Sequence, residues 1–171
     1  ISCKKENNIQ EPVKENPRFV YDQYGRVLIL HGLNMAGSSK RDILTDSLTY
    51  LHHYPWTSET FVDREAKDYG FNAVRYLVFW EGIEPFKDDF RQEYLDSTAK
   101  FIDWYTSRGM YVIFDMHQDI YGPLVYGNGA PKWATITNGQ NPSTNVPGQL
   151  WWLQNLHPGV INAYQNFFQY T

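Results

Sequence analysis

Four polar side chains follow a run of strand-forming residues in the segment YVIFDMHQDIYG, residues 111–122. Asp115, His117, Gln118 and Asp119 prefer water or a polar partner, whereas the residues before them are typical of a strand. A strand that ends in several hydrogen-bonding side chains usually carries them to a site. We therefore expect these residues to lie at a binding site, and His117 and Asp119 to stand at its entrance.

A charged residue interrupts a second apolar run, NAVRYLVFW, residues 72–80. An unpaired guanidinium in such a strand would be very costly, so Arg75 must meet a carboxylate or line a polar cavity. His117 and Asp119 have no third ligand at the spacing that a zinc site requires, so we expect neither a metal nor another cofactor.

Three apolar runs predict the strands that position these residues: 27–31, 72–80 and 110–117. Because they are nearly continuous, they indicate parallel strands covered on both faces. Helical patterns occupy residues 57–70, 91–109 and 159–170. The last two carry apolar stripes, at Tyr94, Leu95, Thr98, Phe101, Ile102 and Tyr105, and at Val160, Ile161, Tyr164, Phe167 and Phe168. The order β-α-β-α-β-α predicts right-handed crossovers and a parallel sheet.

The connections differ in length on the two sides of the predicted strands. Those after helices are short, whereas those after strands are long, and residues 118–157 form a stretch without a predicted element. Functional residues of parallel α/β folds lie on the loops that leave the carboxyl ends of strands. A long loop there usually has a binding role. Before the first strand, FVYDQYGRVLILHG predicts a hairpin around Gln-Tyr-Gly.

Composition limits the class of protein. The 171 residues, 42% of them apolar, suffice for one domain with a sizeable core. The net charge of -4 argues against a nucleic-acid partner. Six Trp and thirteen Tyr suit either the stacking of sugar rings or a tyrosine-rich core, and composition leaves both open. No apolar run approaches the roughly 20 residues that span a bilayer.

The amino-terminal segment ISCKKENN contains the single cysteine, Cys3, which excludes an internal disulfide. Its setting resembles the end of a bacterial lipoprotein signal, in which a cysteine becomes the lipidated first residue. We therefore expect residues 1–18 to form a flexible tether, attached to a membrane through Cys3. The implied location is the bacterial cell envelope, at the surface or in the periplasm, or secretion. The alternative is a solvated free thiol.

Three motifs together carry a family resemblance. LHGLNMAGSSK, GFNAVRYLVFWEGIEP and GMYVIFDMHQDIYG, the last followed by GNGAPKWA, occur in this order at the three predicted strand ends. From about Val27 to Trp133 the chain resembles glycoside hydrolase family 5, and within it the endoglycoceramidase-like enzymes. The resemblance implies a (β/α)8 barrel, so residues 19–171 are expected to be its N-terminal part, about three βα units, incomplete at the C-terminus.

The resemblance also implies a retaining mechanism with two glutamates, an acid/base on the fourth strand and a nucleophile on the seventh. Both are expected beyond Thr171, so the catalytic residues are unknown from this sequence. Glu81 and Glu84 lie near a strand end, but on one short loop they do not flank a bond from two sides. We expect the C-terminal half of the barrel to come from the same chain or a separate one.

Five residues match substrate-binding or supporting positions of the family. The resemblance implies that Lys40 contacts substrate, Arg75 supports the ionised nucleophile, His117 and Asp119 bind sugar hydroxyls, and Trp133 lines the glycan site. An alternative stays open for each residue. Lys40 is otherwise an exposed lysine, and Arg75 belongs to a structural ion pair. His117 and Asp119 are otherwise a polar cluster that holds a loop, and Trp133 packs over the barrel.

The resulting hypothesis is a retaining β-glycosidase that hydrolyses the glycan-to-lipid bond of a glycolipid, with a glycolipid or oligosaccharide as substrate. Another family 5 activity is the first alternative, a steryl glucosidase or an endoglucanase. A non-catalytic glycan-binding lipoprotein is the second, and it would bind sugar without turnover.

Overall fold

The computed structural model describes residues 18–35, 58–146 and 148–169, so Cys3, Lys40 and nearly all of the expected tether lie outside the described residues. The chain divides into two compact units, Ile1–His31 and Gly32–Thr171. In the first, Tyr21 and Val27 form an antiparallel bridge. The Asp22 carboxylate accepts the backbone N–H of Arg26 at 2.9 Å, and Gly25 takes the left-handed φ of +74° that the turn needs. The predicted hairpin is confirmed.

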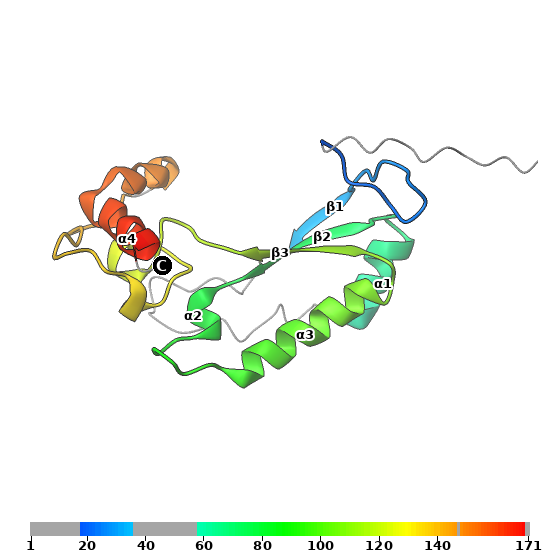
Figure 1. Ribbon diagram of the computed structural model, residues 1–171, viewed down its shortest axis with the longest axis horizontal. Helices are drawn as coiled ribbons and strands as arrows, with labels where there is room; N and C mark the ends of the chain where they lie inside the picture. Colours follow the sequence, from blue (N-terminus) through cyan, green and yellow to red (C-terminus); the bar gives the residue numbers. More distant parts are fainter. Residues whose placement is uncertain (1–17, 36–57, 147, 170–171) are drawn as a thin grey trace, which may run out of the picture. The chain divides into compact units, whose positions relative to one another are not determined.

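The second unit contains a parallel sheet in the order β1-β2-β3, as predicted (Figure 1). Its strands are β1, Gly32–Met35; β2, Ala73–Val78; and β3, Tyr111–Met116. The prediction of the first strand at residues 27–31 was wrong. Strand β1 begins where it pairs with Ala73, and a side chain at Gly32 would overlap the Ala73 carbonyl group. The apolar residues of the run do not by themselves reveal this pairing, because the pairing depends on the neighbouring strand.

The predicted helices are confirmed. Helix α1, Glu59–Lys67, is capped at its N-terminus by Ser58, whose side chain accepts the N–H of Phe61. The short α2, Trp80–Ile83, follows β2, α3 spans Gln92–Thr106, and α4 spans Pro158–Gln169. The prediction that residues 118–157 lack elements was wrong, because this stretch contains three 3-10 segments, η3, Pro123–Val125; η4, Lys132–Ala134; and η5, Gly148–Leu156. Each is too short or too irregular to leave a helical repeat in the sequence.

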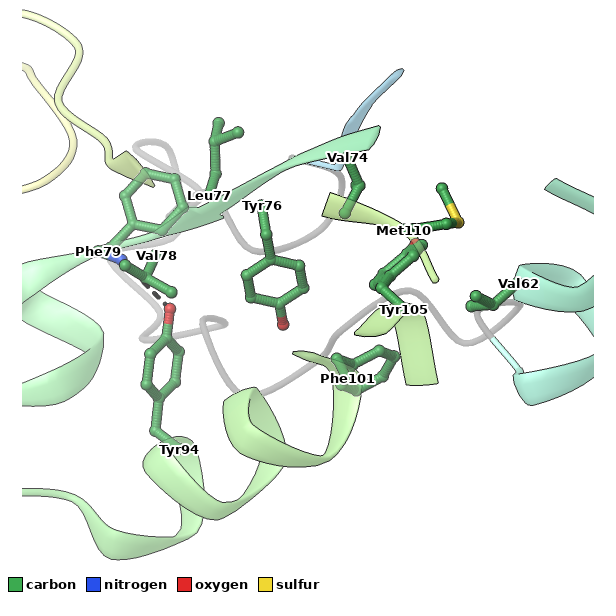
Figure 2. Close-up of a cluster of buried hydrophobic side chains, with 10 residues drawn as sticks. All are labelled: Val62, Val74, Tyr76, Leu77, Val78, Phe79, Tyr94, Phe101, Tyr105 and Met110. Atoms are coloured by element: carbon green, nitrogen blue, oxygen red, sulfur yellow. Dashed lines mark hydrogen bonds between the residues drawn. The ribbon is translucent and has the colours of Figure 1, made fainter. Parts of the chain in front are cut away.

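The main core lies between the sheet and helices α1 and α3. Figure 2 shows Val74 and Tyr76 directed to the helix side of β2, where Phe101 packs, whereas Leu77 points to the other side. The Tyr76 and Phe101 rings stack at 6.3 Å. The core consists of Val62, Val74, Tyr76, Leu77, Val78, Phe79, Tyr94, Phe101, Tyr105 and Met110. Strand β2 is therefore covered on both faces, as predicted.

Strand β3 departs from that prediction. Ile113, Phe114 and Met116 are 46%, 52% and 55% exposed. Strand β2 has a paired neighbour on each side, whereas within the described residues the outer edge of β3 pairs with none. Apolar sequence therefore did not imply burial here.

A second apolar cluster joins the loop after β3 to helix α4. It contains Ile120, Tyr121, Val125, Ala130, Val160 and Ala163, with Trp80 and Tyr164 packed against it. The predicted stripe of α4 is only partly right, because Ile161, Phe167 and Phe168 are 46%, 43% and 69% exposed. No helix in the described part of the chain has the length and apolar character of a membrane span.

Candidate active site

The sheet brings together one polar residue from each strand. Asn34 is the register partner of Arg75, and Asp115 is that of Leu77, two residues further along β2. Because side chains alternate between the faces of a strand, these three residues share the face opposite Val74 and Tyr76. The helices cover the other face, so the polar row lies on the side that a closed barrel would enclose.

Arg75 meets the carboxylate that its position in an apolar strand requires. Its Nη2 lies 2.6 Å from Asp115 Oδ2, and its Nη1 donates to Asn34 Oδ1 at 3.4 Å. The Arg75 side chain is 41% exposed and that of Asp115 25% exposed, so water also reaches the pair. The expectation of a carboxylate partner is confirmed, and the pair holds the guanidinium in one orientation.

His117 links the pair to the loop after β3. Its backbone N–H donates to the Val78 carbonyl oxygen at 2.8 Å, which continues the ladder beyond the strand. In the ring, Nδ1 lies 3.0 Å from Asp115 Oδ2, and Nε2 lies 3.3 Å from Asp119 Oδ1. The Phe79 ring packs edge-on at 5.6 Å and limits rotation of the imidazole. The imidazole therefore lies between two carboxylates.

The segment YGNGA holds Asp119 in place. Asp119 and Asn128 exchange backbone hydrogen bonds of 2.9 and 2.8 Å. A side chain at Gly129, where φ is +127°, would come 2.8 Å from the His117 carbonyl oxygen, so glycine is required for this approach. The next residue, Ile120, has a φ of +68°, which is strained for a β-branched side chain. Such strain persists where the surrounding structure enforces it.

Trp133 lies against a different group of residues. Its indole N–H donates to the Glu84 backbone oxygen at 3.1 Å, and its ring is edge-on to Trp80 at 5.3 Å. The Glu84 carboxylate in turn accepts from the Trp80 indole at 2.8 Å. Of the five residues predicted from the sequence, the structure brings Arg75, His117 and Asp119 together. It places Trp133 beside Glu84, and Lys40 lies outside the described residues.

Sequence reasoning placed Asp115 at the binding site without naming its partner, and it assigned Asn34 no role. The signal for Asp115 was present, because Arg75 required a carboxylate and the spacing of Asp115 from His117 places both on one face of an extended chain. Asn34 left no comparable signal, since its contact with Arg75 depends on the register of β1.

The cluster of Arg75, Asp115, His117 and Asp119 combines acceptors and donors that suit an uncharged, hydroxyl-rich ligand. Asp115 and Asp119 lie on either side of one imidazole and do not face each other across an open space. This arrangement suits binding and orientation better than proton transfer by paired carboxyls. In the described part of the chain, no group of three His, Cys, Asp or Glu side chains has the geometry to hold a metal.

Comparisons with known proteins agree with this geometry. The family model for cellulase, glycosyl hydrolase family 5, matches residues 28–165. Endoglycoceramidase I of Rhodococcus hoagii is 30% identical over 132 residues, which are 77% of this chain and 25% of that protein. The glucosylceramidase of Rhizopus delemar is 28% identical over 153 residues, 79% of this chain and 22% of that protein.

A solved structure matches with similar coverage. Endo-glycoceramidase II from Rhodococcus sp., in complex with ganglioside GM3, has a TM-score of 0.69 and 35% identity. The match covers 90% of this chain and 34% of that chain, so the chain spans about a third of the solved structure and about a quarter of the two sequence relatives. The resemblance predicted from the motifs is confirmed. The chain belongs to glycosyl hydrolase family 5, and its βα units are the N-terminal part of a (β/α)8 barrel.

Proposed function

We propose that this protein acts as a retaining β-glycosidase on the bond between a glycan and a lipid. The cluster of Arg75, Asp115, His117 and Asp119 carries the proposal, since it extends from Arg75 within β2 to the carboxyl end of β3, and (β/α)8 enzymes bind substrate at the carboxyl ends of their strands. The names of the relatives support a glycolipid substrate, because they are an endoglycoceramidase and a glucosylceramidase.

In this proposal Asp119 and His117 bind hydroxyl groups of the sugar next to the scissile bond. The Asp119 carboxylate accepts hydroxyl protons, and it orients the ring as the bond breaks. Arg75 presents a fixed positive charge beside the site and supports the ionised form of the nucleophile. Asp115 holds Arg75 and His117 in these positions through contacts of 2.6 and 3.0 Å.

Hydrolysis of lactosylceramide by the complete protein, with the expected catalytic glutamates present, tests the assignment. Asp119→Ala is expected to lower turnover by about 10- to 100-fold, the loss of one or two hydrogen bonds to a charged group, while the free energy of unfolding changes by less than about 1 kcal/mol. Asp103→Ala, at an exposed position of α3, is the control and should change neither quantity. Equal losses of turnover and stability in Asp119→Ala would contradict the site assignment.

The alternatives give different results in the same experiment. Release of glucose from a steryl glucoside in preference to release of lactose from lactosylceramide would favour the steryl glucosidase. Cleavage of cellulose oligomers would favour the endoglucanase. Saturable binding of lactose without turnover would favour the non-catalytic glycan-binding lipoprotein. The methyl glycoside formed when methanol replaces water as the acceptor identifies the stereochemistry, since a retaining enzyme transfers the glycan to methanol with its β configuration unchanged.

We further propose that β3 pairs with a following barrel strand, from the same polypeptide or from a separate one that carries the catalytic glutamates. The exposed Ile113, Phe114 and Met116 on an edge strand support this, because such an edge is prone to pair. Intact mass, measured under native and denaturing conditions on protein purified from its source, tests it. A single species of 20.1 kDa in both would contradict it.

The proposed location is the bacterial cell envelope, through a lipid on Cys3, or secretion. The sequence around Cys3 supports lipid attachment. Incorporation of labelled palmitate into the protein, abolished by Cys3→Ser and retained in Ser2→Ala, is the expected result. Label that persists in Cys3→Ser would refute attachment at this residue.

A further inference from the structure

A cavity of about 460 Å³ lies among aromatic side chains that the proposed function does not use. Its walls include Trp80, Tyr121, Trp133 and Phe167, with Lys87 and Asn166 among the polar residues. The volume is within the range of small-molecule sites. None of the four residues of the polar cluster lines it. The cavity therefore needs an explanation of its own.

The aromatic walls hold one another in fixed orientations. The Trp80 ring lies 5.3 Å from that of Trp133, at 84°, and 5.9 Å from that of Phe167, at 65°. Both indole N–H groups are already used, because Trp80 donates to the Glu84 carboxylate at 2.8 Å and Trp133 donates to the Glu84 backbone oxygen at 3.1 Å. These walls consequently offer ring carbons to a ligand and keep their donors for Glu84.

The uncharged polar groups of the lining also have partners. The Tyr121 hydroxyl donates to the Ala134 carbonyl oxygen at 3.4 Å. The Asn166 amide donates to the Ile136 carbonyl oxygen at 2.8 Å and to Asn138 Oδ1 at 3.2 Å. A sugar needs several hydrogen bonds in the plane of its ring as well as stacking, and this lining has few groups left to make them.

Among the described residues that line the cavity, Lys87 is the only charged one. Lys87 is exposed and forms no ion pair with any residue that the structure describes. A ligand that matches the cavity therefore has an apolar body for the rings and one negative group for the ammonium. We propose that the cavity binds an anionic amphiphile, with its hydrocarbon part against the rings of Trp80, Trp133 and Phe167 and its anionic head at Lys87.

Dodecanoate, below its critical micelle concentration, is the probe. Binding is measured on the 15N-labelled chain from the indole N–H resonances of Trp80 and Trp133, assigned with Trp→Phe variants. Saturable shifts of both resonances are expected. Shortening the probe to decanoate should weaken binding by up to about fourfold per methylene, the value for complete burial of each group. This readout needs no turnover, so it is independent of the proposed glycosidase activity.

Two pairs of variants locate the ligand. Lys87→Gln should weaken dodecanoate about two- to fivefold and leave dodecanol unchanged, as expected for a partly exposed ion pair. Lys132→Gln, an exposed lysine outside the lining, is its control. Ile136→Trp fills the cavity from its 38% exposed edge and should abolish binding, whereas Ile161→Trp, at a 46% exposed isoleucine elsewhere, should not.

The proposal is overturned if dodecanoate produces no saturable shift, or if dodecyltrimethylammonium binds as tightly as dodecanoate. It is also overturned if lactose shifts the same two indole resonances at lower concentration. Binding that survives Ile136→Trp in folded protein places the ligand elsewhere. If Ile136→Trp does not fold, the exposed Lys87→Gln variant decides, and equal affinity of wild type and variant for dodecanoate refutes the proposal.

Discussion

Replacing Asp115 by alanine removes the carboxylate that contacts both Arg75 and His117. Asp115 Oδ2 lies 2.6 Å from Arg75 Nη2 and 3.0 Å from His117 Nδ1. Hydrogen bonds to charged groups contribute about 1.5–3 kcal/mol, and removing one partner of a fully buried ion pair costs about 3–5 kcal/mol. Arg75 is 41% exposed and keeps its contacts with Asn34 at 3.4 Å and with His117 Nδ1 at 3.3 Å, so water and these partners replace part of the interaction. We therefore expect a loss of about 1–2 kcal/mol in the free energy of unfolding.

The assay is urea unfolding at low salt and again in 1 M NaCl. Asp115→Asn keeps an acceptor oxygen without the charge, so its loss should be about half that of the alanine variant. Asp96→Ala is the control, because Asp96 is exposed on α3 and, within the described ranges, its side chain accepts only a local hydrogen bond from Gln92. Its effect should stay within about 0.5 kcal/mol. The His117 ring resonances should move in both Asp115 variants and not in the control.

Two results would refute the reasoning. A loss above about 3 kcal/mol would mean that the pair behaves as a fully buried one, contrary to its exposure. A loss below about 0.5 kcal/mol together with unchanged His117 resonances would mean that Asp115 does not hold the cluster.

Three further predictions concern the core and the helix contacts of the second unit. Tyr94→Phe removes the buried hydroxyl that accepts the Phe79 N–H at 3.2 Å, and should cost about 1–3 kcal/mol in urea unfolding, while an unchanged stability would contradict this role. Burial raises the pKa of Glu65, so its contribution to stability is present below the ordinary carboxyl pKa and falls as pH rises through the raised value. Glu65→Gln should remove this part of the decline in stability with rising pH, and parallel curves of stability against pH for wild type and variant would contradict it. The hydrogen bond from Arg108 lowers the pKa of Asp63 to about 2. Arg108→Gln should raise this pKa toward its ordinary value, as measured by carboxyl 13C NMR, and an unchanged Asp63 pKa in the variant would contradict the prediction.

Local patterns predicted the elements whose residues interact mainly with their neighbours in sequence. The stripe of α3 was sufficient, because Tyr94, Thr98, Phe101 and Tyr105 lie on one side of a regular helix. The need of Arg75 for a carboxylate was also predictable, since it follows from the cost of an unpaired charge among apolar residues. The three motifs at the predicted strand ends, taken together and in their order along the chain, were enough to identify the family before any geometry was known.

Sequence reasoning failed where a residue's surroundings come from distant segments. The exposure of Ile113 and Phe114 depends on which strands flank β3, and residue type does not report this. The start of β1 depends on the close approach of Gly32 to Ala73. The glycan-site role of Trp133 stays a prediction, whereas its contacts with Trp80 and Glu84 depend on a loop packing that the sequence did not reveal.

The sequence by itself determined the parallel βα order, the family and three members of the polar cluster. These properties follow from side-chain periodicity, from sequence motifs and from the desolvation cost of one arginine. Only the tertiary structure decided that Asp115 joins Arg75 to His117 and that Trp133 lines an aromatic cavity beside Lys87. The physical reason is that strand register and loop packing bring together residues far apart in sequence, and local propensity does not specify those distances.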